Sequence, residues 1–288
     1  MPSLRRQRPA APAAASSPGS RSDGLLRPTL DTLPSLRPAD TVQAQTDVGP
    51  MLLHAADRTI TPQLVHEGTW EPDEAQFLRA VITPGDVVVD IGANVGYFTL
   101  LGAHATGDAG TVIAVEPQVH NAELLRANVW RHGLVNVQIL PAAAGAERGF
   151  LGLHELIPNN TGSFETRPTW GPDDAIVPVV GLDEVLEDLV VDVVKVDVQG
   201  ADHEAIAGMR RALGRSPQAV VLTEFWLDGM EARGVTPVQV LASYRASQRP
   251  LSLLGPGGST TRADDAEIIA ACERSEGRFV NLVLGPLA

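Results

Sequence analysis

The sequence contains only one cysteine and one lysine in 288 residues. Cys272 has no second thiol with which to form a disulfide inside the chain, and no group of cysteines and histidines has the spacing of a zinc site. This cysteine usage suits a reducing compartment, so we expect a cytoplasmic protein. Long apolar runs are also absent. None approaches the roughly 18 residues of a membrane-spanning helix, and we expect no membrane contact.

The first forty residues lack the periodicity of a helix or a strand. They are rich in proline, alanine, serine and arginine, which predicts a disordered N-terminal arm over residues 1–45. Arg5 and Arg6 are not followed by the apolar segment of a secretion signal, while an organellar transit peptide stays open as an alternative to a dispensable tail. We expect residues 46–288 to form one folded domain.

Positive charge is scarce outside the arm. The first forty residues hold six arginines and three aspartates, so the other 248 residues hold 16 basic and 32 acidic side chains. A body this acidic argues against contact with a phosphate backbone, and we expect no nucleic-acid partner.

Strand-like and helix-like segments alternate from about residue 47 onward. Two extended segments, 51–55 and 58–68, come first, and a helix with an acidic first turn is predicted over 71–81. The later strand-like segments are rich in valine and show little polar alternation, as expected when helices cover both faces of a sheet. The predicted fold class is therefore α/β, with a doubly wound, mostly parallel sheet. The segment 150–180 interrupts this alternation and is predicted to be an insertion or an antiparallel excursion.

The stretch VVVDIGANVGYFTL, residues 87–100, is an apolar strand followed by a glycine-spaced turn and a helix. A dinucleotide fingerprint that begins at Gly92 requires glycine at positions 94 and 97, where Asn94 and Tyr97 stand. An NAD(P)-dependent oxidoreductase is therefore a disfavoured alternative. In a doubly wound sheet, ligands bind beyond the carboxyl ends of the strands, where the acids Glu116 and Asp197 fall.

The pattern Asp-x-Gly-x-Asn-x-Gly at 90–96 resembles motif I of the Rossmann-like S-adenosylmethionine (SAM) methyltransferases. The ordered series DIGANVG, AVEP, LDEVL and KVDVQG resembles the FkbM-type methyltransferases over Gly68 to Phe225. This resemblance implies a SAM-dependent methyltransferase domain over 46–288 whose last strand is antiparallel. It also implies transfer to a small-molecule acceptor, most often a hydroxyl. The low lysine and high arginine, alanine and proline usage suggests a GC-rich coding sequence, which would fit the tailoring of secondary metabolites. A catalytically silent scaffold stays open as an alternative, because Gln199 replaces a carboxylate of the family pattern.

The cofactor site predicted from these motifs lies around the turn. Glycine allows the backbone to approach a ligand, and asparagine tolerates a left-handed conformation. We expect the Asp90 carboxylate to lie near the ammonium group of SAM, the turn amides to meet its carboxylate, and Glu116 to accept its ribose hydroxyls. The residues predicted to bind SAM are Asp90, Gly92, Ala93, Asn94, Gly96, Tyr97, Glu116, Pro117, Asp197 and Gln199.

The chemical step requires a base for the acceptor hydroxyl. Asp197 is the first candidate, and Glu224 and His203 are the others. Two carboxylates at neighbouring strand ends also suit Mg²⁺, although a metal is not favoured over carboxylates without an ion. For the single lysine, Lys195, an ion pair with a neighbouring acid is favoured over catalysis. The residues predicted to bind the acceptor are Asn159, Asn160 and Trp70.

Overall fold

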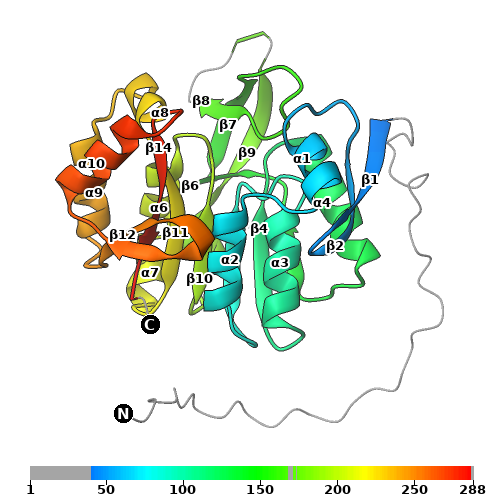
Figure 1. Cartoon of the computed structure of the whole chain (residues 1–288), viewed down its shortest axis with the longest axis horizontal. Coiled ribbons are helices and arrows are strands. Elements are labelled where there is room, and N and C mark those ends of the chain that lie inside the picture. Colours follow the sequence, from blue (N-terminus) through cyan, green and yellow to red (C-terminus); the bar gives the residue numbers. More distant parts are fainter. Residues whose placement is uncertain (1–39, 168–170, 173, 287–288) are drawn as a thin grey trace.

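The computed structural model describes residues 40–167, 171–172 and 174–286. Helices cover both faces of a central sheet, and a small second sheet and an N-terminal hairpin lie beside it (Figure 1). The predicted arm falls largely outside the described residues. Strand β1 begins at Thr41, so an arm that extends to residue 45 overlaps this strand, whose backbone pairs with β2.

The central sheet has the order β13-β12-β14-β11-β10-β3-β4-β5. Its five parallel strands are β3 (Val87–Ile91), β4 (Thr111–Val115), β5 (Val137–Leu140), β10 (Val193–Val196) and β11 (Val220–Trp226). The last strand, β14 (Phe279–Leu284), pairs antiparallel with β11 and with β12 (Leu251–Leu254), which carries β13 (Thr260–Arg262) at the edge. The predicted doubly wound sheet with an antiparallel last strand is thus confirmed.

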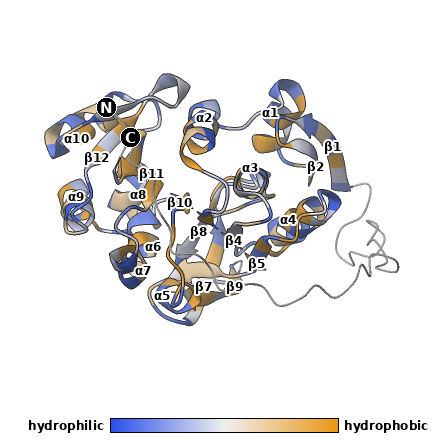
Figure 2. Ribbon diagram, turned by 90° about the horizontal axis from the view of Figure 1, so that it is seen from below, coloured by the Kyte–Doolittle hydropathy of each residue, from blue (hydrophilic) through white to orange (hydrophobic). Residues whose placement is uncertain are grey.

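Two apolar clusters fill the two faces of this sheet. Figure 2 shows hydrophobic residues along the strands of the sheet and the helices around it. Val88 belongs to one cluster and Val89 to the other, because successive side chains of a strand point to opposite faces. The first cluster includes α2 (Pro72–Val81), α3 (Tyr97–Thr106) and α4 (Val119–Arg131). The second includes α5 (Leu182–Val185), α6 (Asp202–Gly208), α7 (Arg210–Arg215), α8 (Leu227–Ala232), α9 (Pro237–Arg245) and α10 (Asp265–Arg274). A short 3-10 turn, η3, spans Pro256–Gly258. None of the helices in the described part of the chain is long and apolar enough to cross a membrane.

The N-terminal part of the described chain is a hairpin followed by a helix. The hairpin consists of β1 (Thr41–Thr46) and β2 (Gly49–His54), and α1 spans Ile60–Glu67. The predicted extended segment over 58–68 is therefore wrong. The Asp57 carboxylate accepts hydrogen bonds from the amides of Thr59 and Thr61 at 3.3 and 2.6 Å, which satisfies two free donors at the start of the helix.

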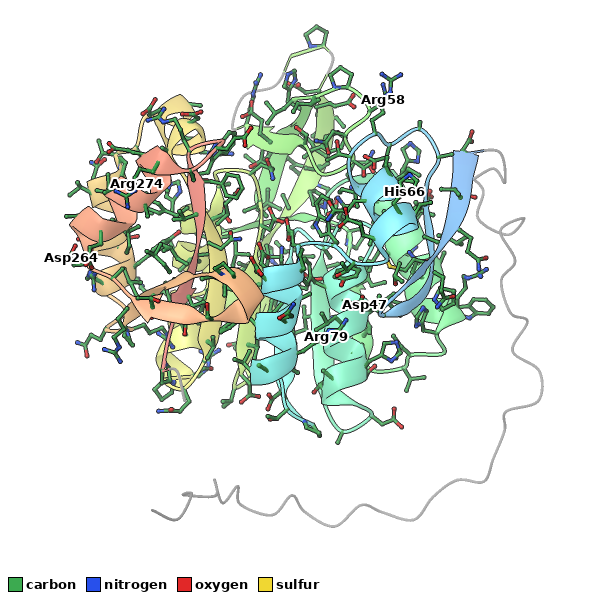
Figure 3. The ribbon with its side chains drawn as sticks, viewed as in Figure 1. Asp47, Arg58, His66, Arg79, Asp264 and Arg274 are labelled. Carbon is green, nitrogen blue, oxygen red and sulfur yellow. The ribbon has the colours of Figure 1, made fainter. Side chains whose placement is uncertain are left out.

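An ion pair joins this hairpin to the sheet-covering helices. The side chains of Asp47, between β1 and β2, and Arg79, on α2, lie next to each other (Figure 3), with 2.9 Å between Oδ2 and Nη2. Both side chains are more than one-third exposed, so the pair contributes little to stability. The pair shows that the turn of the hairpin lies against α2.

The second sheet contains four strands in the order β6-β9-β7-β8. These are β6 (Ala143–Gly145), β7 (Gly149–Glu155), β8 (Phe164–Arg167) and β9 (Ala175–Gly181). Strand β7 pairs antiparallel with both β8 and β9, which confirms the antiparallel excursion over 150–180. Strands β5 and β6 are separated at Pro141, because proline lacks the amide that a continuous strand needs.

Candidate active site

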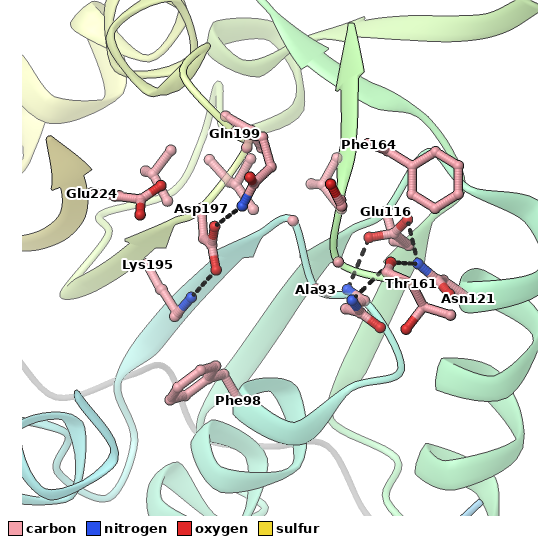
Figure 4. A pocket seen from close by; sticks show the side chains of 18 of the residues that line it. Ala93, Phe98, Glu116, Asn121, Thr161, Phe164, Lys195, Asp197, Gln199 and Glu224 are labelled. Atoms are coloured by element: carbon pink, nitrogen blue, oxygen red, sulfur yellow. Dashed lines mark hydrogen bonds and ion pairs between the residues drawn. The ribbon is translucent and has the colours of Figure 1, made fainter. Parts of the chain in front are cut away.

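A cavity of about 270 Å³ lies at the carboxyl ends of β3, β4, β10 and β11. Figure 4 shows its two ends, with Glu116 and Asn121 at one and Lys195, Asp197 and Glu224 at the other. The sequence-predicted site residues that line it are Trp70, Gly92, Ala93, Asn94, Tyr97, Glu116, Pro117, Asn160, Asp197, Gln199 and Glu224. Four other candidates are not among the lining residues: Asp90, Gly96, Asn159 and His203.

The glycine-spaced turn packs tightly against its neighbours. Gly92 has φ of +83°, and a Cβ atom there would lie 1.9 Å from the carbonyl oxygen of Asp197. Gly96 has φ of +98°, and its Cβ would lie 2.5 Å from Cδ1 of Leu125 on α4. Both positions therefore require glycine for backbone conformation and for close packing. The turn is held against β10 on one side and against α4 on the other.

The amides of this turn all donate within the protein. Gly92 and Ala93 donate to the carbonyl of Val115 at 2.9 and 3.1 Å, and Gly96 donates to the carbonyl of Ala93 at 2.9 Å. Asn94 donates to the Glu116 carboxylate at 2.8 Å, and the Val95 amide donates to the Asn94 side chain at 2.7 Å. Each of these amides thus has an acceptor within the protein, and the expected contact with the carboxylate of the cofactor stays a prediction.

Glu116 presents a buried carboxylate at one end of the cavity. Burial raises its pKa to about 7, although backbone amides oppose the shift. Oε2 accepts from the Asn94 amide, and Oε1 accepts from the Gln118 amide, both at 2.8 Å, while the Asn121 side chain lies 3.4 Å from Oε1. Oε1 thus has two donors and Oε2 has one, so Oε2 retains a lone pair that can accept from a hydroxyl of a ligand.

Asp90 lies on β3, just before the glycine-spaced turn, and its side chain does not line the cavity. Its side chain points toward α3, where Oδ2 accepts a hydrogen bond of 2.6 Å from the Thr99 hydroxyl. Oδ1 is buried without a hydrogen-bond partner, and burial raises the pKa of the carboxyl group. Successive side chains of a strand point to opposite faces of the sheet, which explains why Ile91 lines the cavity and Asp90 does not.

A loop at residues 156–163 closes the Glu116 end of the cavity. The carbonyl of Thr161 accepts from the side chains of Asn121 and Asn94 at 2.9 and 3.1 Å. The amide and hydroxyl of Thr161 both donate to Oδ1 of Asp57, at 2.9 and 3.2 Å. Asn160 lines the cavity, whereas the Asn159 amide donates to Glu155 on the exposed side of the loop. Hydrogen bonds thus hold the loop to the segment just before α1, to α4 and to the glycine turn.

Three carboxylates surround the single lysine at the other end of the cavity. Lys195 Nζ lies 2.9 Å from Asp197 Oδ2, 3.7 Å from Glu74 Oε2 and 3.8 Å from Glu71 Oε2, and it sits 4.4 Å above the ring centre of Phe98. Burial opposes the charge of Lys195, but the neighbouring carboxylates outweigh it and raise the pKa of the amine. Burial raises the pKa of Glu71, Glu74 and Glu224. The predicted ion pair of Lys195 with an acid is confirmed.

The catalytic candidates differ in their surroundings. Asp197 is held by Lys195 and by the Gln199 side chain, whose Nε2 lies 3.4 Å from Oδ1. Glu224 has one buried oxygen without a hydrogen-bond partner. His203 belongs to α6 and does not line the cavity. Burial lowers its pKa, and its Nε2 lies 3.9 Å from Oε1 of Glu204. Asp197 and Glu224 therefore share the cavity, and His203 does not.

Two aromatic side chains border the cavity near the start of α2. Trp70 lines it and also packs on the first apolar cluster. The Tyr97 hydroxyl donates to Asp47 at 2.8 Å and lies 3.0 Å from the Thr69 hydroxyl. These contacts link the segment before α2 to the turn that carries the glycines.

Comparison with known families identifies the chain. The family model described as the methyltransferase FkbM domain matches residues 90–239, slightly more than half of the 288 residues. The chain belongs to the FkbM methyltransferase family. It is accordingly a SAM-dependent methyltransferase, and the resemblance found in the sequence is confirmed.

Several solved structures resemble this FkbM methyltransferase at low sequence identity. A putative rRNA methylase from Clostridium thermocellum is 10% identical, covers 76% of this chain and 98% of its own, and has a TM-score of 0.45. A SAM-dependent O-methyltransferase from Thermotoga maritima is 14% identical, covers 86% and 78%, and has a TM-score of 0.44. TYW2 from M. jannaschii, in complex with AdoMet, is 14% identical, covers 85% and 84%, and has a TM-score of 0.44. No curated protein matches the sequence.

Some cavity residues of the FkbM methyltransferase were not singled out in the sequence. Glu71 and Glu74 fit an acidic first helical turn, and Asn121 and Thr161 are ordinary residues of a helix and a loop. Only the fold brings them beside the motif residues. Within the described ranges, no group of three or more histidine, cysteine, aspartate or glutamate side chains is arranged to hold a metal ion.

Proposed function

We propose that this protein transfers the methyl group of SAM to a hydroxyl of a small organic molecule. The observation that carries the proposal is the arrangement of one cavity, with Glu116 at one end and Asp197 and Glu224 at the other. The first carboxylate suits the ribose of the cofactor, and the other two suit the transfer of a proton.

The residues of the cavity fit SAM on their chemistry. Bound SAM supplies a methyl group attached to a positively charged sulfur. Glu116 would accept hydrogen bonds from the ribose hydroxyls, and the buried oxygens of Glu71 and Glu224, which have no hydrogen-bond partner, suit cationic groups. Among the described lining residues the only basic side chain is Lys195, which already contacts three carboxylates.

We assign the base to Glu224 and an orienting role to Asp197. The contact with Lys195 neutralises Asp197, whereas burial raises the pKa of Glu224 and leaves one of its oxygens without a partner. A carboxylate with a raised pKa is the stronger base. As the acceptor oxygen forms its bond to the methyl carbon, its proton passes to Glu224 and the electron pair of the broken carbon–sulfur bond remains on sulfur. Gln199, which lies beside Asp197, holds this carboxylate in place.

The electrostatics of the cavity favour a small molecule over a nucleic acid as the acceptor. The carboxylates that line it outnumber the single lysine, so a phosphate backbone would be repelled. The low lysine and high arginine, alanine and proline usage of the sequence fits a tailoring role in secondary metabolism. The one cysteine, buried at Cys272, suits a cytoplasmic location.

The first experiment tests the cofactor. S-adenosylhomocysteine (SAH) should raise the melting temperature, and NADH should not. Glu116→Gln should weaken SAH binding by about 10- to 150-fold, because hydrogen bonds to a charged group are lost. Glu187→Gln, at an exposed position of the described chain, is the matched control. A melting temperature that responds to NADH but not to SAH would overturn the assignment.

The second experiment tests the chemistry with labelled SAM and a set of small alcohols, amines and thiols. Transfer to oxygen should predominate, and Glu224→Gln should lower turnover by about a hundredfold or more with little change in SAH affinity. If Asp197→Asn produces this result and Glu224→Gln does not, the two roles are reversed. SAM binding without transfer to any acceptor would favour the catalytically silent scaffold.

A further inference from the structure

The proton-transfer end of the cavity holds four acidic side chains and one basic side chain among its described lining residues. Glu71 and Glu74 come from the start of α2, Asp197 follows β10, and Glu224 lies on β11. Their only basic neighbour among the described lining residues is Lys195, which is 4% exposed. SAM brings a net single positive charge, so the four acidic side chains still outnumber the positive charges when the cofactor is in place.

Two oxygens of this group lack hydrogen bonds. Oε2 of Glu71 and Oε2 of Glu224 have almost no accessible surface and no hydrogen-bond partner, although both residues line the cavity. Glu74 differs, because its Oε1 accepts from the Asn281 side chain at 2.5 Å. A buried acceptor without a donor is costly, which indicates that a ligand supplies the missing donors.

In the cofactor orientation set by Glu116, the missing donors would come from the acceptor. Glu224 and Lys195 lie at the opposite end of the cavity from Glu116, where the proposed function places the ribose (Figure 4). Glu71 lies at the same end as Lys195, with 3.8 Å between Oε2 and Nζ. A protonated amine carries three donors and one positive charge, and it can bridge carboxylates that come from different elements. A neutral hydroxyl has one donor and leaves the excess charge in place.

We propose that the acceptor of this methyltransferase carries a protonated amine beside the hydroxyl that is methylated, with the amine held between Glu71 and Glu224. This inference rests on the proposed function, because it takes the orientation of the cofactor from Glu116. It names the substrate class as amino alcohols, which include amino sugars. Glu71 and Glu224 are then the residues that select for charge.

The test uses two SAM analogues that place an arm where the acceptor binds. In both, a nitrogen replaces the sulfur; its arm is 3-aminopropyl in one and 3-hydroxypropyl in the other. Calorimetry at pH 7.5 should show that the aminopropyl compound binds about tenfold or more tightly, as expected for charged rather than neutral hydrogen bonds. Glu71→Gln and Glu224→Gln should each reduce this preference to about twofold or less, because a neutral amide offers no charge. Glu231→Gln, on α8 and exposed, should retain it.

SAH binding to the same protein separates the two proposals. If SAH binds and the aminopropyl arm gives no advantage, or if Glu71→Gln and Glu224→Gln both keep the full preference, the inference about the acceptor is wrong and the proposed function stands. If SAH itself does not bind, the cofactor assignment fails, and the acceptor assignment fails with it.

Discussion

Replacing Gly92 by alanine should destabilise the protein by about 3 kcal/mol, from two causes that the structure separates. The backbone at Gly92 is left-handed, with φ of +83°, a conformation that costs roughly 1–2 kcal/mol for a residue with Cβ. The new Cβ would also lie 1.9 Å from the Asp197 carbonyl oxygen. The turn and β10 must move apart to relieve this clash, and such overpacking costs about 1–3 kcal/mol.

Gly85 provides a matched control for the conformational part. Its φ is +91°, close to that of Gly92, but a Cβ added there meets no atom within 4 Å. Gly85→Ala should therefore cost only the conformational penalty, about 1–2 kcal/mol. Urea denaturation of the two variants measures the difference directly, and Gly92→Ala should be less stable than Gly85→Ala by about 2 kcal/mol. Equal destabilisation of the two variants would refute the claim that contact with β10 demands glycine at position 92.

Three further predictions concern charge and the loop over the cavity. Burial raises the pKa of Glu116 to about 7 from its ordinary value of 4.5, so the contribution of this residue should make the free energy of unfolding fall as the pH rises from about 4.5 to 7. SAH affinity should rise with pH through 7, because ionisation makes the carboxylate a stronger acceptor. Glu116→Gln should flatten both profiles, as measured by denaturation and by calorimetry. Lys195→Met leaves buried carboxylates without their cation and should cost about 3–5 kcal/mol, more at pH 8 than at pH 6 since protonation relieves the repulsion; an equal loss at both pH values would contradict this account. Asp57→Ala removes the acceptor of the Thr161 amide and should speed hydrogen exchange at Thr161 while leaving exchange in β11 unchanged, a pattern that mass spectrometry can resolve.

The sheet was predictable because its strands carry a strong local pattern. Valine-rich segments separated by helical segments specify a parallel sheet, and the turn after β3 is recognisable from its glycine spacing. Helix α1 was not predicted from the sequence. Its start is stabilised by a single side chain, Asp57, which accepts hydrogen bonds from two amides, and one such residue does not stand out in a sequence. Short elements of this kind depend on single contacts rather than on a repeated pattern.

The site was predictable where a residue ends a strand and unpredictable where the contact is distant in sequence. Glu116 and Asp197 follow strands of the sheet, so their place at the cavity follows from the topology. Asp90 also lies in a strand, but alternation turns its side chain toward Thr99 and away from the cavity. Thr161 meets Asp57 across 104 residues of sequence, a contact that only the tertiary fold specifies.

The solitary lysine has a consequence for experiment. Since every other basic side chain in the sequence is an arginine or a histidine, lysine labelled with ¹⁵N at Nζ introduces a single labelled site, and that site is in the cavity. Its resonance would report ligand binding and the ionisation of the surrounding acids without any substitution in the protein. Reagents that cross-link or tag lysines have no other lysine side chain to attack, and Lys195 itself is 4% exposed. The one lysine among the acids of the site thus serves as a built-in spectroscopic reporter of it.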